Sequence, residues 1–258
     1  MNDLSFAHRD FINRSPYAMF VFYSAEALGT PDPKWTGLGN RSIQDAKHET
    51  LNLTNLAIWL ANPCSFSFDI IFHIDEFKTE KNIRAIRQVR DFEPHLNYVK
   101  TFLQQSDLSL AKKLHGTMLG IPRQSVIWIS LYSLWNALRE PEWGTRYTLL
   151  WIALEALFGP EDGREITFRL SQRIGFFLGK SRSESFEVFE RAKLLYKWRS
   201  KVVHGLRLSK LKEQESISVS YDTEMLLRKS LVKILNSPKL RSKFSSSREK
   251  YLDSISFN

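Results

Sequence analysis

The sequence predicts a mainly α-helical protein, in which an antiparallel bundle of four or five helices follows a small α+β segment. Three observations predict this fold class. Hydrophobic residues make up 43% of the 258 residues, which is enough apolar material for a buried core. From about residue 107 onward, apolar side chains recur at helical spacing. The connections between these helical stretches are short, and short connections favour antiparallel neighbours.

The first third of the chain mixes helix and strand patterns. Leucines recur at helical spacing before Pro63, which ends that helix because proline cannot continue it. A later run is rich in Phe and Ile, as in a strand. We expect helices over residues 50–61, 81–90 and 96–104, and a strand over residues 65–74. These elements form a predicted N-terminal domain over residues 1–105, whose role the sequence does not indicate.

The rest of the chain, residues 106–258, is predicted to be one helical domain with a core over about residues 125–235. Glycine or proline follows the predicted helices closely, as at Gly179 and Gly205. The expected helices cover residues 125–138, 145–158, 166–178, 186–203 and 223–235. Their tryptophans at 128, 135, 143 and 151 are expected in the core or at a dimer interface. A strand-like pattern occurs at residues 216–220, and the last twenty residues, rich in Ser, Lys and Arg, are expected to be loosely held.

The positive charge of the chain is unevenly distributed. The net charge is +9, yet residues 1–124 hold 14 basic and 13 acidic residues. Residues 163–212 hold 13 basic and 4 acidic residues, so this window alone equals the whole chain in net charge. Such a concentration indicates a surface that faces a polyanion, although a solvated, Lys-rich helix face would give the same count.

Several classes of site are excluded by the absence of their residues. The single cysteine, Cys64, rules out a disulfide framework and a multi-cysteine metal site. No HExxH metal motif and no GxxxxGK[ST] phosphate loop occurs, so we expect no metal and no cofactor. The N-terminus lacks a signal-peptide pattern, and the apolar stretches are too short to span a bilayer. We therefore expect a cytoplasmic protein that does not contact a membrane.

One spacing carries chemistry: Arg199 is separated by four residues from His204. A second copy of the same spacing, Arg90 and His95, shows that the pair alone has little specificity. That copy contains a proline and two acids, which break a helix and repel a phosphate, so we interpret it as incidental.

The Arg199 copy has the opposite context, because it ends an amphipathic helix and is followed by Gly205. In an unbroken helix, five residues turn ~140° and rise ~7.5 Å, so the two side chains would diverge. They can meet only if the helix ends at about Val203, or if two copies of the chain face each other.

Three blocks around this pair carry a resemblance to a known family. They are RYTLLWIALEALFG at residues 146–159, EITFRLSQRIGFFLG at residues 165–179 and LLYKWRSKVVHG at residues 194–205. In order and spacing they resemble the HEPN superfamily of RNA-cleaving and nucleotide-binding helical domains, and most of all its Apea-like branch. The resemblance covers about residues 125–235. It implies a helical bundle that forms a homodimer, with two Arg/His pairs in one cleft.

The resemblance also implies an activity, namely metal-independent endoribonuclease cleavage in which a 2′-hydroxyl attacks the adjacent phosphorus. His204, with a pKa near neutrality, suits a general base or acid, and Arg199 suits transition-state charge stabilisation. Proteins of this kind include toxins and antiviral defence effectors, so an antitoxin or regulatory partner is a further expectation. The alternative is a non-catalytic HEPN module that binds RNA, a nucleotide or a protein.

Six further residues are predicted to support the site, each with a structural alternative. Glu155 is a lone acid in an apolar helix; it is either buried against Arg199 or Arg169, or exposed on the polar side. The predicted RNA-binding residues are Arg169, Arg173, Tyr196, Lys197 and Lys201. The arginines can instead be surface residues or pair with Glu165, and the lysines can simply be solvated. Tyr196 can stack on a base or belong to the core.

Overall fold

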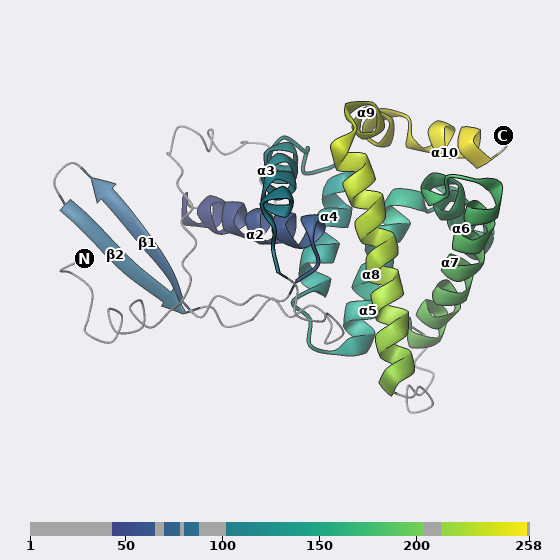
Figure 1. Ribbon diagram of the computed structural model, residues 1–258, viewed down its shortest axis with the longest axis horizontal. Coiled ribbons are helices and arrows are strands. Elements are labelled where there is room, and N and C mark those ends of the chain that lie inside the picture. Colours follow the sequence, from purple (N-terminus) through teal and green to yellow (C-terminus); the bar gives the residue numbers. More distant parts are fainter. Residues whose placement is uncertain (1–42, 65–69, 78–79, 88–101, 204–212, 257–258) are drawn as a thin grey trace. The chain divides into compact units, whose positions relative to one another are not determined.

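The computed structural model describes residues 43–64, 70–77, 80–87, 102–203 and 213–256 (Figure 1). The chain divides into two compact units. The first comprises Met1–Leu51 and Phe66–Asp91, and the second comprises Asn52–Ser65 and Phe92–Asn258. The predicted fold class is confirmed, because helices dominate the described residues and pack as a bundle. The predicted domain boundary near residue 105 stays a prediction.

The first unit contains a β-hairpin of two antiparallel strands. Strand β1 spans Ile70–Phe77 and β2 spans Glu80–Arg87, with Ile70 opposite Arg87 and Phe77 opposite Glu80. The strand predicted over residues 65–74 is thus present from Ile70 and continues to Phe77, while residues 65–69 lie outside the described residues. The helix predicted over residues 81–90 is wrong, because Ile83 and Ile86 fit helical spacing equally well, while pairing with β1 decides the conformation.

The second unit is built around long helices whose predicted apolar faces form the core. Helix α4 spans Val126–Ala137, α5 spans Trp143–Phe158, and α8 spans Glu213–Asn236. The same unit also contains α3, Gln105–Leu119, and the part of helix α2, Ile43–Ala61, that follows Leu51. Tyr147 fixes α5 against helix α7, Arg182–Val203, because its buried hydroxyl donates a 2.7 Å hydrogen bond to the carbonyl of Leu195.

Helices α6, Ile166–Leu178, and α7, Arg182–Val203, lie side by side and run antiparallel (Figure 1). Phe168 near the start of α6 contacts Phe189 on α7, whereas Gly175 near the end of α6 lies against Ser185. A Cβ atom on Gly175 would lie 2.6 Å from the Ser185 carbonyl oxygen, so glycine is what allows this close approach. The close crossing places the first turn of α6 beside Tyr196.

The C-terminal residues are ordered helices, which corrects the prediction of a loose tail. Helix α9 spans Pro238–Ser246 and α10 spans Arg248–Ser256. Ser237 caps α9 by accepting a hydrogen bond from the backbone of Leu240, and Pro238 occupies the first helical position. Phe244 and Leu252 are buried, so each short helix is held by an apolar anchor.

One further sequence prediction, a strand over residues 216–220, needs correction. The strand-like run at residues 216–220 lies inside α8. Its neighbours decide this, because the indole of Trp143 donates hydrogen bonds to the Ser216 carbonyl and to the Ser220 hydroxyl.

The predicted helix over residues 96–104 lies mainly outside the described residues, and α3 begins only at Gln105. Among the described helices, none combines the length and apolarity that a bilayer crossing requires.

Candidate functional site

The candidate site centres on the carboxylate of Glu155, which connects α5 to α7. Arg199 Nε lies 3.0 Å from Glu155 Oε1, and Arg199 Nη2 donates a 3.3 Å hydrogen bond to Oε2. The Tyr196 hydroxyl donates a 3.0 Å hydrogen bond to Oε1. Of the predicted partners for Glu155, the structure therefore selects Arg199. Both charged side chains stay about a quarter exposed, so the pair is accessible from solvent.

Tyr196 fixes the geometry of this pair from the core side. Its ring packs edge-on against the buried Trp151 at a centroid distance of 4.9 Å, and the Arg199 guanidinium lies 5.7 Å from the same ring. Burial, followed by the negative charge of Glu155, raises the pKa of Tyr196 to about 12. The ring is only 7% exposed, so the core alternative holds for Tyr196, and the base-stacking prediction for its ring is corrected.

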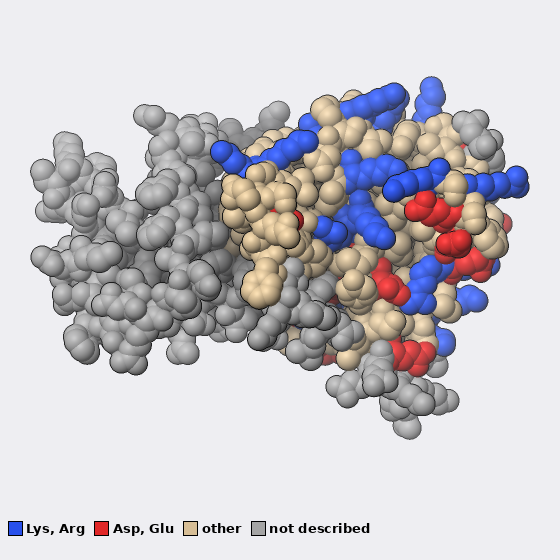
Figure 2. Space-filling view, viewed as in Figure 1, with Lys and Arg blue, Asp and Glu red and all other residues tan. Residues whose placement is uncertain are grey.

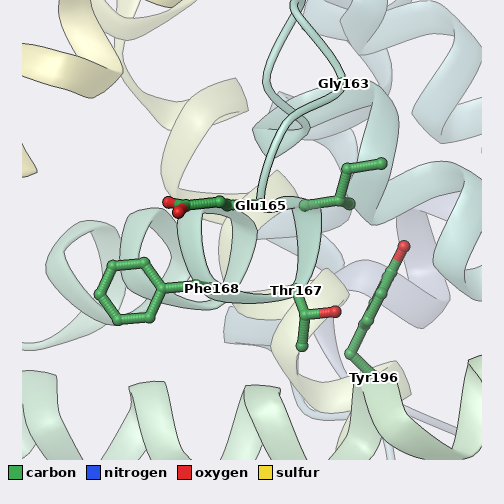
Figure 3. Close-up of a pocket in the computed structure, with 6 residues that line it drawn as sticks. Gly163, Glu165, Thr167, Phe168 and Tyr196 are labelled. Carbon is green, nitrogen blue, oxygen red and sulfur yellow. The ribbon is translucent and has the colours of Figure 1, made fainter.

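A pocket that opens to solvent adjoins Tyr196. It is lined by Gly163, Glu165, Ile166, Thr167, Phe168 and Tyr196. Thr167 and Tyr196 lie on the same side of the first turn of α6, while Phe168 points away from them (Figure 3). In the turn before α6, Gly163 adopts a φ of 66°, a left-handed conformation that glycine tolerates well.

The remaining part of the site is a set of cations on α7. Lys197 and Lys201 are exposed, and neither forms an ion pair within the described part of the chain. The Lys201 ammonium lies 3.9 Å from the centre of the Trp198 ring, which holds it near the surface of the helix. Both lysines are therefore placed where a phosphate backbone could reach them.

Arg173 and Arg169 are placed differently from the sequence prediction. Arg173 is buried, with its guanidinium 2.5 Å from Glu249 Oε1 and 2.7 Å from Asp253 Oδ1, both on α10. Arg173 Nη1 also donates a 3.2 Å hydrogen bond to the Phe158 carbonyl. A buried, fully occupied guanidinium presents nothing to a ligand, so RNA contact by Arg173 is corrected to a structural role.

Arg169 is partly exposed and also ion-paired, at 2.6 Å from Asp162 and 3.3 Å from Glu249. Its ion pairs are thus with Asp162 and Glu249, and not with Glu155. The sequence analysis weighed Glu165 as the acid partner of these arginines; the structure pairs both of them instead with Glu249, which lies 80 residues away from Arg169.

These ion pairs reduce the positive charge that residues 163–212 leave unneutralised. Acids outside the window neutralise several of its cations, among them Asp162, Asp222 and Glu249. On the face shown in Figure 2, blue and red side chains are accordingly interleaved over the helical unit. Lys197 and Lys201 are therefore exposed cations of α7 near the site, and Arg164, Lys180 and Arg182 are exposed elsewhere in the window.

His204 lies outside the described residues, and the bounds of α7 end one residue before it, at Val203. Whether His204 and Arg199 meet therefore stays a prediction. In the described part of the chain, no three side chains of His, Cys, Asp or Glu come together as metal ligands would. Comparisons with models of protein families, with curated proteins and with solved structures found no match to this chain.

The sequence analysis missed one part of the surface beside the site. Phe168, Phe186 and Phe189 cluster on α6 and α7, and the first two are 47% and 62% exposed. A sequence signal for two of them exists, because Phe186 and Phe189 are three residues apart and share a helix face.

Proposed function

We propose that the protein is a metal-independent endoribonuclease of the HEPN type, acting as a homodimer in the cytoplasm. In this proposal a 2′-hydroxyl attacks the adjacent phosphorus, His204 transfers the proton, and Arg199 stabilises the negative charge of the transition state. The proposed biological roles are those of a toxin or an antiviral defence effector, with an antitoxin or regulatory protein as partner.

The observation that carries the proposal is the way in which Arg199 is held. Its guanidinium is anchored by Glu155, which is itself fixed by the Tyr196 hydroxyl, at the end of the helix that leads directly to His204. A fixed guanidinium costs less entropy when it engages a transition state than a freely rotating one. It also remains partly exposed, and the exposed cations of Lys197 and Lys201 lie on the same helix.

The test is RNA cleavage by the purified protein in the presence of EDTA. We expect cleavage of RNA and none of DNA, because the attacking 2′-hydroxyl is missing in DNA, and we expect products that end in a 2′,3′-cyclic phosphate. Arg199→Ala and His204→Ala should each lower the rate by at least about 100-fold, the scale of one transition-state donor or one general acid or base.

The chain supplies a matched control, since Arg90 and His95 have the same spacing as Arg199 and His204. Arg90→Ala and His95→Ala should leave cleavage unchanged. Cleavage that survives both Arg199→Ala and His204→Ala would refute the proposal. RNA binding without any cleavage product, retained in His204→Ala, would favour the non-catalytic binding module instead.

A further inference from the structure

Three phenylalanines form an exposed aromatic cluster on α6 and α7, here called the aromatic strip: Phe168, Phe186 and Phe189. The Phe168 and Phe189 ring centroids lie 5.5 Å apart, and those of Phe186 and Phe189 lie 6.2 Å apart. Phe186 is 62% exposed and Phe168 is 47% exposed. Large aromatic side chains are usually buried, so three neighbouring rings at the surface indicate a ligand that covers them.

The aromatic strip is continuous with cations of α7. Phe186, Phe189, Lys193 and Lys197 recur at three- and four-residue intervals, which places them along one face of the helix. The Lys193 ammonium lies 5.2 Å from the centre of the Phe189 ring, and Lys197 is exposed one turn further on. Two rings are therefore followed by two positive charges along a single surface, with Glu190 beside Lys193.

The same surface reaches the candidate site. Phe168 borders the pocket that Tyr196 also lines, and Tyr196 hydrogen-bonds to the carboxylate that holds Arg199 (Figure 3). Arg199 follows Lys197 by two residues and so lies on another side of α7; a ligand would reach it from Phe168 through the pocket beside Tyr196.

We propose that the aromatic strip binds single-stranded RNA by base stacking, with the phosphates at Lys193 and Lys197, and leads the strand to the pocket beside Tyr196. This inference rests on the proposed function. Aromatic faces stack with any base, and lysines attract the backbone, which is the combination that single-strand-binding proteins use. The rings are tilted by 77° and 37° to one another, so they fit bases that are splayed apart and not the parallel stack of a duplex.

The area and charge of the surface favour RNA over a second copy of the chain. Three partly exposed rings offer roughly 300 Å² of apolar surface, whereas each partner of a stable complex buries about 800 Å². Lys193 also carries an ion pair with Glu190 at 3.5 Å beside the rings, and a protein interface would have to desolvate both charges. RNA leaves that edge hydrated.

The experiment measures fluorescence anisotropy of a labelled uridine oligoribonucleotide and of an abasic ribose-phosphate strand of equal length. It uses the full chain carrying His204→Ala, so that no strand is cleaved. Adding Phe168→Ala and Phe186→Ala should weaken binding of the uridine strand by about tenfold, the effect of losing a stacked base. Binding of the abasic strand should stay unchanged, because its phosphate contacts remain.

The matched control is Tyr132→Ala on α4, which removes an aromatic side chain that is 58% exposed and lies outside the strip. It should change neither affinity. Circular dichroism and sedimentation of each variant exclude unfolding and altered association, and both substituted phenylalanines are exposed enough for the fold to be kept.

The outcomes separate this inference from the proposed function. Strip-dependent uridine binding together with a wild-type protein that never cleaves supports the inference and refutes the nuclease. Cleavage by the wild type with unchanged uridine affinity in the double variant overturns the inference alone. A double variant that loses self-association and keeps its affinity identifies the strip as a contact between copies, which also overturns the inference. Absence of RNA binding overturns both.

Discussion

Glu155 is the residue on which the geometry of the candidate site depends, because its carboxylate contacts both Tyr196 and Arg199. Its negative charge favours the protonated phenol of Tyr196, adding to the larger effect of burial. Tyr196 is therefore protonated in the folded protein up to about pH 12, whereas the unfolded chain loses that proton near pH 10. This contribution to stability is complete below pH 10 and is lost as the pH rises from 10 through 12.

Replacing Glu155 by Gln tests whether the charge of this carboxylate contributes to the raised pKa of Tyr196. The pKa of Tyr196 should fall from about 12 but stay above 10, because the Glu155 charge is removed while burial remains. A pH titration of carbon-labelled tyrosine by NMR resolves this residue from the others. Tyr221, which is exposed, should not respond to the same substitution. An unchanged Tyr196 titration would show that the carboxylate is not held against the phenol.

The same substitution should cost little stability. Glu155 and Arg199 are both about a quarter exposed, so the loss of their attraction should amount to no more than about 1 kcal/mol. RNA cleavage should nevertheless slow, since Arg199 would lose its fixed position. A large loss of stability with normal cleavage would assign Glu155 to folding alone.

At the scale of the element, the contact between α6 and α7 depends on one glycine. A Cβ atom at Gly175 would lie 2.6 Å from the Ser185 carbonyl oxygen and 3.0 Å from Phe189 Cβ. Gly175→Ala should therefore destabilise the protein by about 1–3 kcal/mol, the usual cost of overpacking. Urea denaturation measures it. Gly116→Ala on α3 is the control, because its Cβ would meet nothing within 4 Å.

The two substitutions should have opposite signs. Alanine has a higher helix propensity than glycine by about 1 kcal/mol, so Gly116→Ala should be neutral or stabilising. Equal effects of both substitutions would mean that α6 and α7 do not approach each other as closely as described. That result would also remove the packing that places Phe168 against Phe189.

The elements that the sequence predicted well have strong local signals. Helix α6 begins and ends where its periodicity and Gly179 place it, and α5 ends before Gly159 as expected. The misplaced elements depend on partners distant in sequence: β2 pairs with β1, and the start of α8 is held by Trp143. Helix α9 had a usable signal, Ser237 before Pro238, which the Ser- and Lys-rich composition obscured.

The same distinction applies to the candidate site. A cation partner for Glu155, either Arg199 or Arg169, could be predicted, because a lone acid in an apolar helix needs one; the structure selects Arg199. The burial of Arg173 could not be predicted, since its partners Glu249 and Asp253 lie 76 and 80 residues further along the chain. Sequence spacing identifies charges, but their neutralisation depends on tertiary structure.

At the scale of the whole molecule, the Arg173 ion pairs fasten α10 to α6. Arg173→Ala removes a buried side chain and its hydrogen bonds and opens a cavity, while Arg169 stays near both acids, so it should cost about 2–4 kcal/mol. Arg169→Ala removes a partly exposed cation from the same cluster and should cost at most about 1 kcal/mol. Thermal unfolding of both variants measures the difference. Similar losses would contradict the burial of Arg173.

The salt dependence of RNA binding tests how much of the +9 charge is available to a ligand. Each phosphate contact on a single strand contributes about −0.7 to the slope of log K against log salt. The exposed cations of α7, Lys193, Lys197 and Lys201, should together give a slope of about −2.

If the whole net charge of residues 163–212 were available, nine contacts would give a slope of about −6. Lys197→Ala and Lys201→Ala should each make the slope shallower by about 0.7, whereas Arg173→Ala should leave it unchanged in the folded fraction. A slope near −6 in the wild type would mean that the acids of α8 and α10 do not neutralise their partners. The ion pairs that hold the helical unit together would then open when RNA binds.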